Sequence, residues 1–276
     1  MLICHNFKII PLENLKISLL NRAFLYGDGL FETIRVKDNN ILFLPDHFER
    51  LYIGMLAMSF YPPSNLTPQY LSQTIYKLIE INNIGKNARV KIQVWRRNDK
   101  NQTGYTPGNN DVDFFIYAVK AQPSEKPVKK NVLFFDDYKL HYSHLSRFKT
   151  CNSLPYILAG IEKNKLKADD MILLDIEDNI SECIASNIFW IKDETVFTPS
   201  LKTGCVEGVM RKNIMRTALQ LNIIVKEVSA KKEELLNADH VFTSNVSAIQ
   251  QVVSIENKKF SVDSEILELI VNNILK

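Results

Sequence analysis

The sequence is short of cysteine, unbroken apolar runs and leader-like features, and each shortage excludes a class of protein. No stretch of its 276 residues approaches the roughly 18 consecutive apolar residues that a membrane-spanning helix needs. The four cysteines (Cys4, Cys151, Cys183 and Cys205) form no CxxC pair, which argues against a disulfide framework or a metal site. The N-terminus has no basic region followed by a long apolar core, as a secretory leader would have. We therefore expect a cytoplasmic protein that has no membrane partner and no metal.

The sequence also has little excess charge. Its formal net charge is +3, and the densest basic run, Lys126 to Lys130, is interrupted by Pro127 and Val128. Such a run is typical of a solvated linker, so no nucleic-acid partner is predicted. Hydrophobic residues make up 46% of the chain, enough for a sizeable core in one large domain or two closely associated ones.

A change in composition near the middle of the chain predicts two domains. Residues 120–131 are polar, contain two prolines and lack aromatic residues, which is typical of a connection. We therefore predict an N-terminal domain at 1–119, a linker at 120–131 and a larger cofactor-binding domain at 132–276. Periodicity predicts helices at 46–59, 67–79, 208–221, 229–236 and 263–275, and strands at 41–44, 89–95, 114–119, 131–135, 171–175, 185–191, 195–198, 241–243 and 248–255.

The order of these elements favours the α+β class, because hairpins and helices alternate without a regular βαβ rhythm. In the helix at 46–59, Asp46 is predicted to be the N-cap, with Glu49 as its capping-box partner. His47 is expected on the exposed surface of that helix.

The nine glycines are few, and four of them fall in two clusters. The pair Gly27 and Gly29 begins like a dinucleotide fingerprint, but Glu32 stands where the third glycine would be. No Gly-Lys-Ser/Thr of a P-loop occurs. The second cluster, Gly204 to Gly208, leads into a helical pattern, which indicates either a plain turn or a helix N-terminus that binds phosphate.

Three charged residues add to the phosphate hypothesis. Lys149 precedes a helical segment, where it is either a surface charge or a Schiff-base nucleophile. Glu182 lies between apolar strands, where a carboxylate needs a cationic partner. Arg50 falls off the apolar stripe of its helix and is either simply exposed or a phosphate ligand. Together they indicate a cofactor that carries both a phosphate and a carbonyl group.

Five motifs occur in the order of one known family. They read RAFLYGDGLFET at 22–33, DHFERL at 46–51, KTCN at 149–152, SECIASNIFW at 181–190, and TP at 198–199 followed by VEGVMR at 206–211. In these motifs the chain resembles the class IV aminotransferases, which have fold-type IV and use pyridoxal 5′-phosphate (PLP). The family includes branched-chain and D-amino-acid aminotransferases and 4-amino-4-deoxychorismate lyases. The resemblance covers essentially the whole chain.

The resemblance implies a fold and a set of roles. Two α/β domains, as in D-amino-acid aminotransferase, would hold PLP between them, and two subunits would form a homodimer. Lys149 would bind PLP covalently and move the proton at the substrate carbon, while Glu182 would pair with the pyridine nitrogen. Arg50 would bind the phosphate. The remaining cofactor contacts would come from Asn187, Val209, Met210 and Asn245, and Glu32 would join the hydrogen-bond network near Lys149.

Within the family, the motifs favour the lyases. D-amino-acid aminotransferases carry Tyr where this chain has Phe31, and an Arg-x-His motif that is absent from 96–105. Branched-chain enzymes usually carry a Thr-Gly-Thr-like loop, where this chain has Thr-Ser-Asn at 243–245, and tend to be longer. The lyases share with this chain Phe31, the run from Glu182 to Trp190, Gly208 to Arg211, Gly104-Tyr105 and Asn245.

One departure concerns the substrate carboxylates. The lyases often have Arg directly before Gly-Tyr, and this chain has Thr103 there. The predicted substrate contacts are therefore Phe31, Glu32, Arg96 and Tyr105, with Arg97 or Lys100 as further candidate anchors. A transaminase that uses a 2-oxo acid acceptor, and a non-catalytic PLP-binding protein, stay open as alternative functions.

Overall fold

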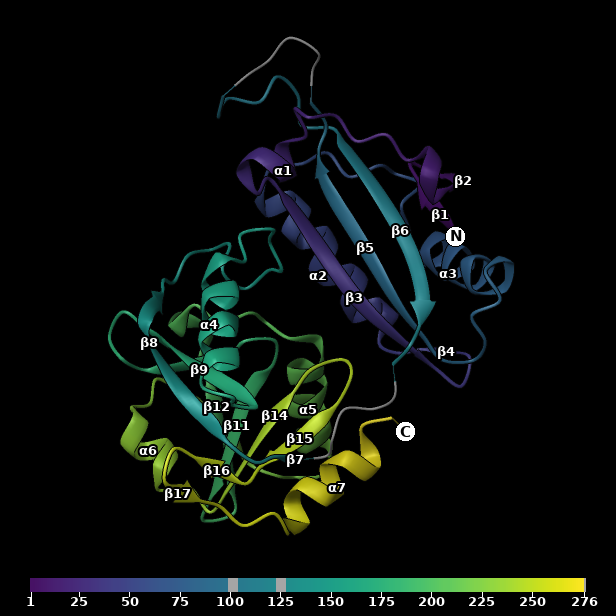
Figure 1. Cartoon of the computed structure of the whole chain (residues 1–276). Helices are drawn as coiled ribbons and strands as arrows, with labels where there is room; N and C mark the ends of the chain where they lie inside the picture. The colour runs from purple at the N-terminus through teal and green to yellow at the C-terminus, as the bar shows by residue number, and fades with distance from the viewer. Residues whose placement is uncertain (99–103, 123–127, 276) are drawn as a thin grey trace. The chain divides into compact units, whose positions relative to one another are not determined.

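The computed structural model describes residues 1–98, 104–122 and 128–275, which form two compact units (Figure 1). Unit 1 comprises Met1–Pro123 and Phe148–Asn152, and unit 2 comprises Ser124–Arg147 and Ser153–Lys276. The segment Phe148–Asn152 therefore groups with unit 1, although unit 2 residues flank it in the sequence. Lys100, Thr103, Lys126 and part of the predicted linker lie outside the described residues.

Unit 1 is built on a six-stranded antiparallel sheet in the order β2-β1-β6-β5-β3-β4. Its long strands are β3 (Gly29–Lys37), β5 (Ala88–Arg96) and β6 (Val112–Lys120), which lie side by side in Figure 1. The short strands are β1 (Leu2–His5), β2 (Lys8–Pro11) and β4 (Asn40–Ile41), and the helical segments are η1 (Leu12–Asn14), α1 (Arg22–Tyr26), α2 (Leu44–Ala57) and α3 (Pro68–Ile81).

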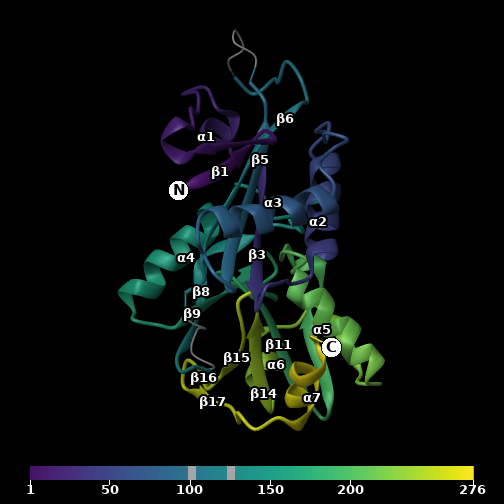
Figure 2. The ribbon, with the colours of Figure 1, turned by 90° about the vertical axis from the view of Figure 1, so that its right-hand side faces the viewer.

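The strands of this sheet alternate between two faces. In β3, Leu30, Ile34 and Val36 are fully buried, on the face against which α2 packs. Glu32 shares this face, and the residues that alternate with these four point to the opposite face. We call this opposite side the Phe31 face; on β3 it carries Phe31, Thr33 and Arg35, and on β5 their cross-strand partners Gln93, Lys91 and Arg89. The view in Figure 2 shows α2 and α3 alongside these strands.

Unit 2 contains two sheets. One has the order β10-β9-β8-β16-β17, and the other has the order β13-β12-β11-β14-β15-β7. The strands are β7 (Val128–Lys129), β8 (Val132–Leu140), β9 (Asp170–Asp175), β10 (Ile180–Cys183), β11 (Asn187–Lys192), β12 (Thr195–Pro199), β13 (Val225–Val228), β14 (His240–Ser244), β15 (Ile249–Val252), β16 (Ser254–Ile255) and β17 (Lys258–Lys259). The helical segments are α4 (Leu154–Lys165), η2 (Leu201–Thr203), α5 (Val209–Gln220), α6 (Lys232–Leu236) and α7 (Glu265–Asn273).

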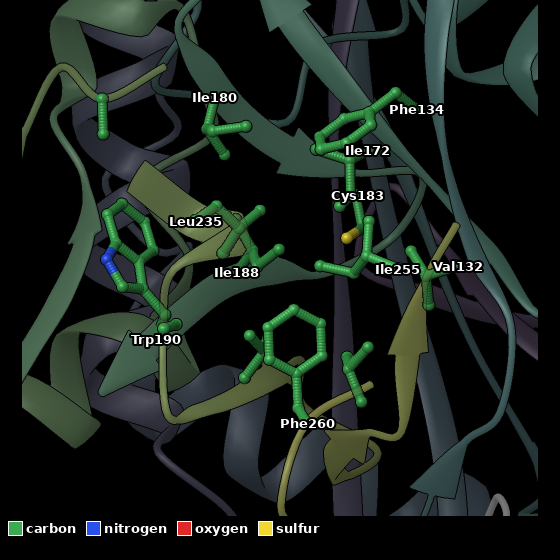
Figure 3. Close-up of a cluster of buried hydrophobic side chains, with 14 of the residues drawn as sticks. Val132, Phe134, Ile172, Ile180, Cys183, Ile188, Trp190, Leu235, Ile255 and Phe260 are labelled. Atoms are coloured by element: carbon green, nitrogen blue, oxygen red, sulfur yellow. The ribbon is translucent and has the colours of Figure 1, made fainter. Parts of the chain in front are cut away.

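An apolar cluster joins strands of both sheets of unit 2 to α6 (Figure 3). Ile172 and Ile180 come from the first sheet, Ile188 and Trp190 from the second, and Leu235 from α6. All five are buried, so removing apolar surface from water holds the two sheets together.

The combination of helices with largely antiparallel sheets confirms the predicted α+β class. The predicted helices are present, but α2 begins at Leu44 after a left-handed Phe43, so the predicted strand at 41–44 and the Asp46 cap are wrong. His47 is buried at 2% exposure, which overturns its predicted place on the surface. The sequence analysis did not predict strands β1, β2, β3, β7, β10, β13 and β17 or helix α1, and it expected α4 only as a helical segment after Lys149, without bounds.

The described residues contain neither a membrane-spanning helix nor a cluster of metal-binding side chains. None of their helices is both long and apolar enough to cross a membrane. Within the same residues, no group of three or more His, Cys, Asp or Glu side chains is arranged to hold a metal ion.

Candidate active site

Lys149 is held at the edge of the unit 1 sheet by backbone pairing with β3. The N–H of Phe31 donates to the carbonyl of Lys149 at 2.9 Å, and the N–H of Cys151 donates to the carbonyl of Gly29 at 2.9 Å. Gly27 ends α1 in the left-handed conformation (φ 68°), and a Cβ there would overlap the Asn152 side chain. The glycine turn thus lets the lysine segment lie directly against the start of β3.

The Phe31 ring brings two amines together. The Nζ of Lys149 lies 4.9 Å from the ring centroid, and the Nζ of Lys91 lies 4.4 Å from it. Burial, followed by the nearby charge of Arg89, lowers the pKa of Lys91. Sequence reasoning missed Lys91, although the alternating pattern at 89–95 had already placed it on the same face as Gln93. Gln93 Nε2 donates to Cys151 Sγ at 2.8 Å on this same face.

Glu32 points to the other side of β3 and orients Arg50. Arg50 Nε donates to Oε1 at 2.7 Å and its Nη2 to Oε2 at 2.6 Å, while His47 Nδ1 lies 2.7 Å from Oε2. Burial opposes ionisation of Glu32, but the charge of Arg50 and the contacts of both partners outweigh it and lower its pKa to about 2. The bidentate pair fixes the guanidinium plane in a way that a lone surface arginine cannot.

Two predicted substrate contacts, Glu32 and Arg96, are engaged inside unit 1 instead, Glu32 by Arg50 and His47 on the face of β3 opposite Phe31, while the role of Tyr105 stays a prediction. Arg96 is buried and donates to Asp28 at 2.9 Å and to the carbonyl of Met58 at 2.8 Å, and its Nη1 also contacts Asn110. These bonds engage Arg96 within the unit 1 core, so the structure contradicts its predicted role as a substrate anchor. Tyr105 is 87% exposed, and its ring lies 5.4 Å from that of Tyr26.

In unit 2, β10 carries Glu182 into a buried set of hydrogen-bond donors. Tyr156 Oη donates to Oε1 at 2.7 Å, and the N–H of Val206 donates to the same oxygen at 3.0 Å. Asn187 Nδ2 donates to Oε2 at 3.4 Å and to the carbonyl of Val206 at 2.8 Å. Burial, followed by the charge of Glu182, raises the pKa of Tyr156 well above its usual value, so Tyr156 acts as the donor. Tyr156 was not predicted.

The N-terminus of α5 lies beside Asn187. Its N-cap is Gly208, and among the described residues no side chain caps the helix. A Cβ on Gly208 would overlap Asn187 Oδ1, so the glycine permits this close approach. Val209 and Met210, both buried residues, begin the helix, where backbone N–H groups and the helix dipole favour an anion.

Ser244 is a further polar group at this end of unit 2. It is the direct cross-strand partner of Asn187, and within the described chain its buried Oγ has no hydrogen-bond partner. Asn245, predicted to contact the cofactor, instead accepts from Ser247 N at 2.8 Å and Ala248 N at 3.1 Å, which closes its own turn. The hydroxyl of Ser244 is therefore the better candidate for a ligand oxygen, and sequence reasoning missed it.

Each part of PLP finds matching chemistry among these residues. In unit 2, the α5 N-terminus and the orphaned Ser244 hydroxyl suit a phosphate. In unit 1, Arg50 is a cation of fixed orientation, a group that also suits a phosphate. Glu182 suits a protonated pyridine nitrogen, and Lys149 suits an aldehyde. Taken by itself, each unit carries donors whose chemistry fits a part of this group.

Comparison with known proteins defines the class. A family model of amino-transferase class IV matches residues 29–255, so the chain belongs to this family. The family consists of PLP-dependent enzymes, which confirms the predicted cofactor and the prediction that the chain is an enzyme rather than a non-catalytic binding protein.

Individual relatives carry two kinds of name. The chain is 27% identical to branched-chain-amino-acid aminotransferase-like protein 2 of Arabidopsis thaliana, covering 91% of this chain but only 45% of that protein. It is 28% identical to aminodeoxychorismate lyase of Bacillus subtilis, over 83% of this chain and 78% of the relative. The crystal structure of a branched-chain aminotransferase from Thermoproteus uzoniensis has the same fold, with a TM-score of 0.90 at 22% identity over 99% of this chain and 93% of that one. The predicted fold-type IV architecture is thereby confirmed.

Proposed function

We propose that the protein is a 4-amino-4-deoxychorismate lyase, which converts aminodeoxychorismate into 4-aminobenzoate, a folate precursor, and pyruvate. The observation that carries this proposal is the pair of amines on the Phe31 ring, those of Lys149 and Lys91. One amine is needed to hold the cofactor. The second amine places a cation where the side chain of the substrate would bind. The aliphatic side chain of a branched-chain amino acid would need only apolar surface there.

The charge of Lys91 distinguishes the candidate substrates. Aminodeoxychorismate has two carboxylates, whereas a branched-chain amino acid has one carboxylate and an aliphatic side chain. A half-buried ammonium binds a carboxylate strongly. An aliphatic side chain packed against the same ammonium would remove water from its charge, which costs free energy. Lys91 also supplies a carboxylate anchor in a chain that has Thr103 where the lyases often have Arg.

The proposed reaction requires one base and balances without water or an oxidant. Lys149 Nζ takes the proton from the substrate carbon that bears the amine. The bond between the ring carbon and the ether oxygen then breaks, and the enolpyruvyl group leaves and takes up this proton from Lys149 Nζ as it becomes pyruvate. The ring becomes aromatic, which drives the cleavage. PLP, when bound, supplies the sink for the electron pair that the departing proton leaves behind.

The remaining residues of the proposed site bind the cofactor or orient the side chains that bind it. We assign Glu182 to the pyridine nitrogen, with Tyr156 and Val206 fixing its Oε1. We assign Arg50, the N–H groups of Val209 and Met210, and Ser244 to the phosphate, with Glu32 fixing the plane of Arg50. Asn187 acts through Glu182 and the Gly208 turn, and Phe31 packs against the substrate.

A transaminase is the second candidate, because several relatives, including the Arabidopsis protein, are named as branched-chain aminotransferases. The same Lys149 and Glu182 would serve it. In that reaction the proton is returned to the cofactor side, and the amine is transferred to a 2-oxo acid.

One assay separates the two functions. Purified protein would receive aminodeoxychorismate generated in situ, and both 4-aminobenzoate and pyruvate would be followed. We expect equal amounts of both products, lost in Lys149→Ala and retained in Lys86→Ala, which removes an exposed lysine. No product above the Lys149→Ala background, together with amino transfer to a 2-oxo acid, would refute the lyase.

We also propose a homodimer. An exposed apolar stripe on α4, which we call the α4 stripe, has members at helical spacing (Leu154, Ile157, Leu158 and Ile161) that are 38–60% exposed. Apolar side chains at i, i+3, i+4 and i+7 form one continuous face, which is typical of a surface that a partner covers.

A further inference from the structure

Two arginines face each other on the unit 1 sheet. Arg35 of β3 and Arg89 of β5 are direct cross-strand partners on the Phe31 face. Like charges placed directly opposite destabilise an antiparallel pair. Lys91 lies on the same strand and the same face as Arg89, two residues further along, so three cations form a short row.

No carboxylate of the described residues compensates this row. Neither Arg35, Arg89 nor Lys91 makes a salt bridge within that part of the chain. Other arginines do contact a carboxylate; they are Arg22, Arg50, Arg96, Arg97, Arg147 and Arg211. The repulsion also reaches Lys91, whose pKa is lowered by burial and then by the charge of Arg89.

We infer that Arg35 and Arg89 form an anion site that binds the second carboxylate of a dicarboxylate substrate, next to the site that Lys91 provides for the first. This inference rests on the proposed function, which supplies a substrate with two carboxylates. A carboxylate between the two guanidinium groups would turn an unfavourable cross-strand pair into two charge-assisted contacts.

The spacing suits such a ligand. Residues two apart on a strand are separated by roughly 6.5–7 Å, so Lys91 and Arg89 can each take one carboxylate of a small rigid molecule. Arg35 is half-buried and Arg89 is exposed, so one guanidinium is held by packing and the other can adjust to the ligand. A substrate with a single carboxylate would use Lys91 and leave the arginine pair unoccupied.

The test uses the PLP-loaded enzyme and two inert probes, benzene-1,3-dicarboxylate and benzoate, with binding measured by calorimetry. Wild type is expected to bind the dicarboxylate at least about tenfold more tightly than benzoate, as one charge-assisted contact allows. Arg35→Gln, Arg89→Gln and the double variant should lose this preference while keeping their benzoate affinity. Lys77→Gln, which removes an exposed cation from α3, should retain the preference.

A second readout needs no ligand. Because the arginine pair repels, Arg89→Gln should raise the melting midpoint of the free protein by about 1–3 °C, whereas Lys77→Gln should not. Equal affinity of wild type for both probes, or a preference that survives in the double variant, would overturn the anion site. If the preference holds but no 4-aminobenzoate forms, the anion site stands and the lyase proposal fails. If 4-aminobenzoate forms with an unchanged KM in both variants, only the anion site fails.

Discussion

Glu32 is a carboxylate buried inside unit 1, and it stays ionised because two cationic groups meet it there. Its folded pKa is about 2, against an ordinary value of 4.5. A depressed acid pKa adds stability that is present above the unfolded pKa and is lost as the pH falls through the folded pKa. The difference corresponds to roughly 3 kcal/mol of unfolding free energy at neutral pH.

The stability of a Glu32→Gln variant should therefore depend on pH differently from that of wild type. At pH 7 we expect the variant to be less stable by roughly 3 kcal/mol. The gap should close between about pH 4.5 and pH 2, as Glu32 is protonated in wild type. Urea unfolding of both proteins across this range measures the gap. A gap that does not change with pH would show that Glu32 is not ionised in the fold, and Glu80→Gln, at an exposed position on α3, is the control.

Tyr156 contacts Glu182 through its hydroxyl group alone. The effect of removing this hydroxyl can therefore be measured without a large change in packing. Tyr156→Phe deletes the 2.7 Å bond to Oε1 and leaves the ring in place. We expect a loss of about 1–3 kcal/mol in unfolding free energy and weaker binding of PLP, because a buried carboxylate loses a donor. Equilibrium unfolding of the apoprotein and a PLP titration measure the two effects. Tyr138→Phe, at an exposed position on β8, should change neither; a Tyr156→Phe variant that also changes neither would remove Tyr156 from the site.

At the scale of elements, the start of α5 depends on a close approach that only glycine permits. In Gly208→Ala the added methyl group would meet Asn187 Oδ1 and push that side chain away from Val206 and Glu182. We expect lower stability and weaker binding of PLP, the latter visible as loss of the bound cofactor's absorbance on dilution.

Gly160 offers the matched control for that substitution. It lies within α4, and a Cβ there would meet nothing within 4 Å. Gly160→Ala should therefore stabilise the protein by roughly 0.5–1 kcal/mol, because alanine loses less entropy in a helix. Equal effects of the two substitutions would refute the proposed role of the Gly208 turn.

The missed elements share a physical cause. Strand β3 contains Glu32 at an inward position, so its pattern does not read as apolar alternation, and only α2 reveals the ion pair that compensates it. His47 was placed on the surface for the same reason, since its partner is 15 residues away. By contrast, the strand at 89–95 and the helix after Thr67 were predicted because their patterns are local. Side chains satisfied over long range, such as Arg96 with Asp28, are invisible to periodicity.

The candidate site shows the same limit. Lys149, Glu182 and Arg50 could be proposed from ordered motifs, because the motifs carry residue identity. Lys91 and Ser244 required the sheet register, which shows what each side chain faces. Lys91 could nevertheless have been predicted, because the alternation in its strand already put it on the face opposite the core.

At the scale of the whole molecule, the α4 stripe sets a test of assembly. Exposed apolar residues at helical spacing are costly in a protein that stays monomeric. If a second copy covers the α4 stripe, Ile157→Asp places a charge in a desolvated interface and should convert dimers to monomers at micromolar concentration. Analytical ultracentrifugation of wild type and variant measures this.

Leu219→Asp is the control. It makes the same change at a position of α5 that is 76% exposed, and it should leave the mass of the assembly unchanged. A wild-type protein with the mass of one chain would refute the homodimer, and a dimer unaffected by Ile157→Asp would place its interface on another surface.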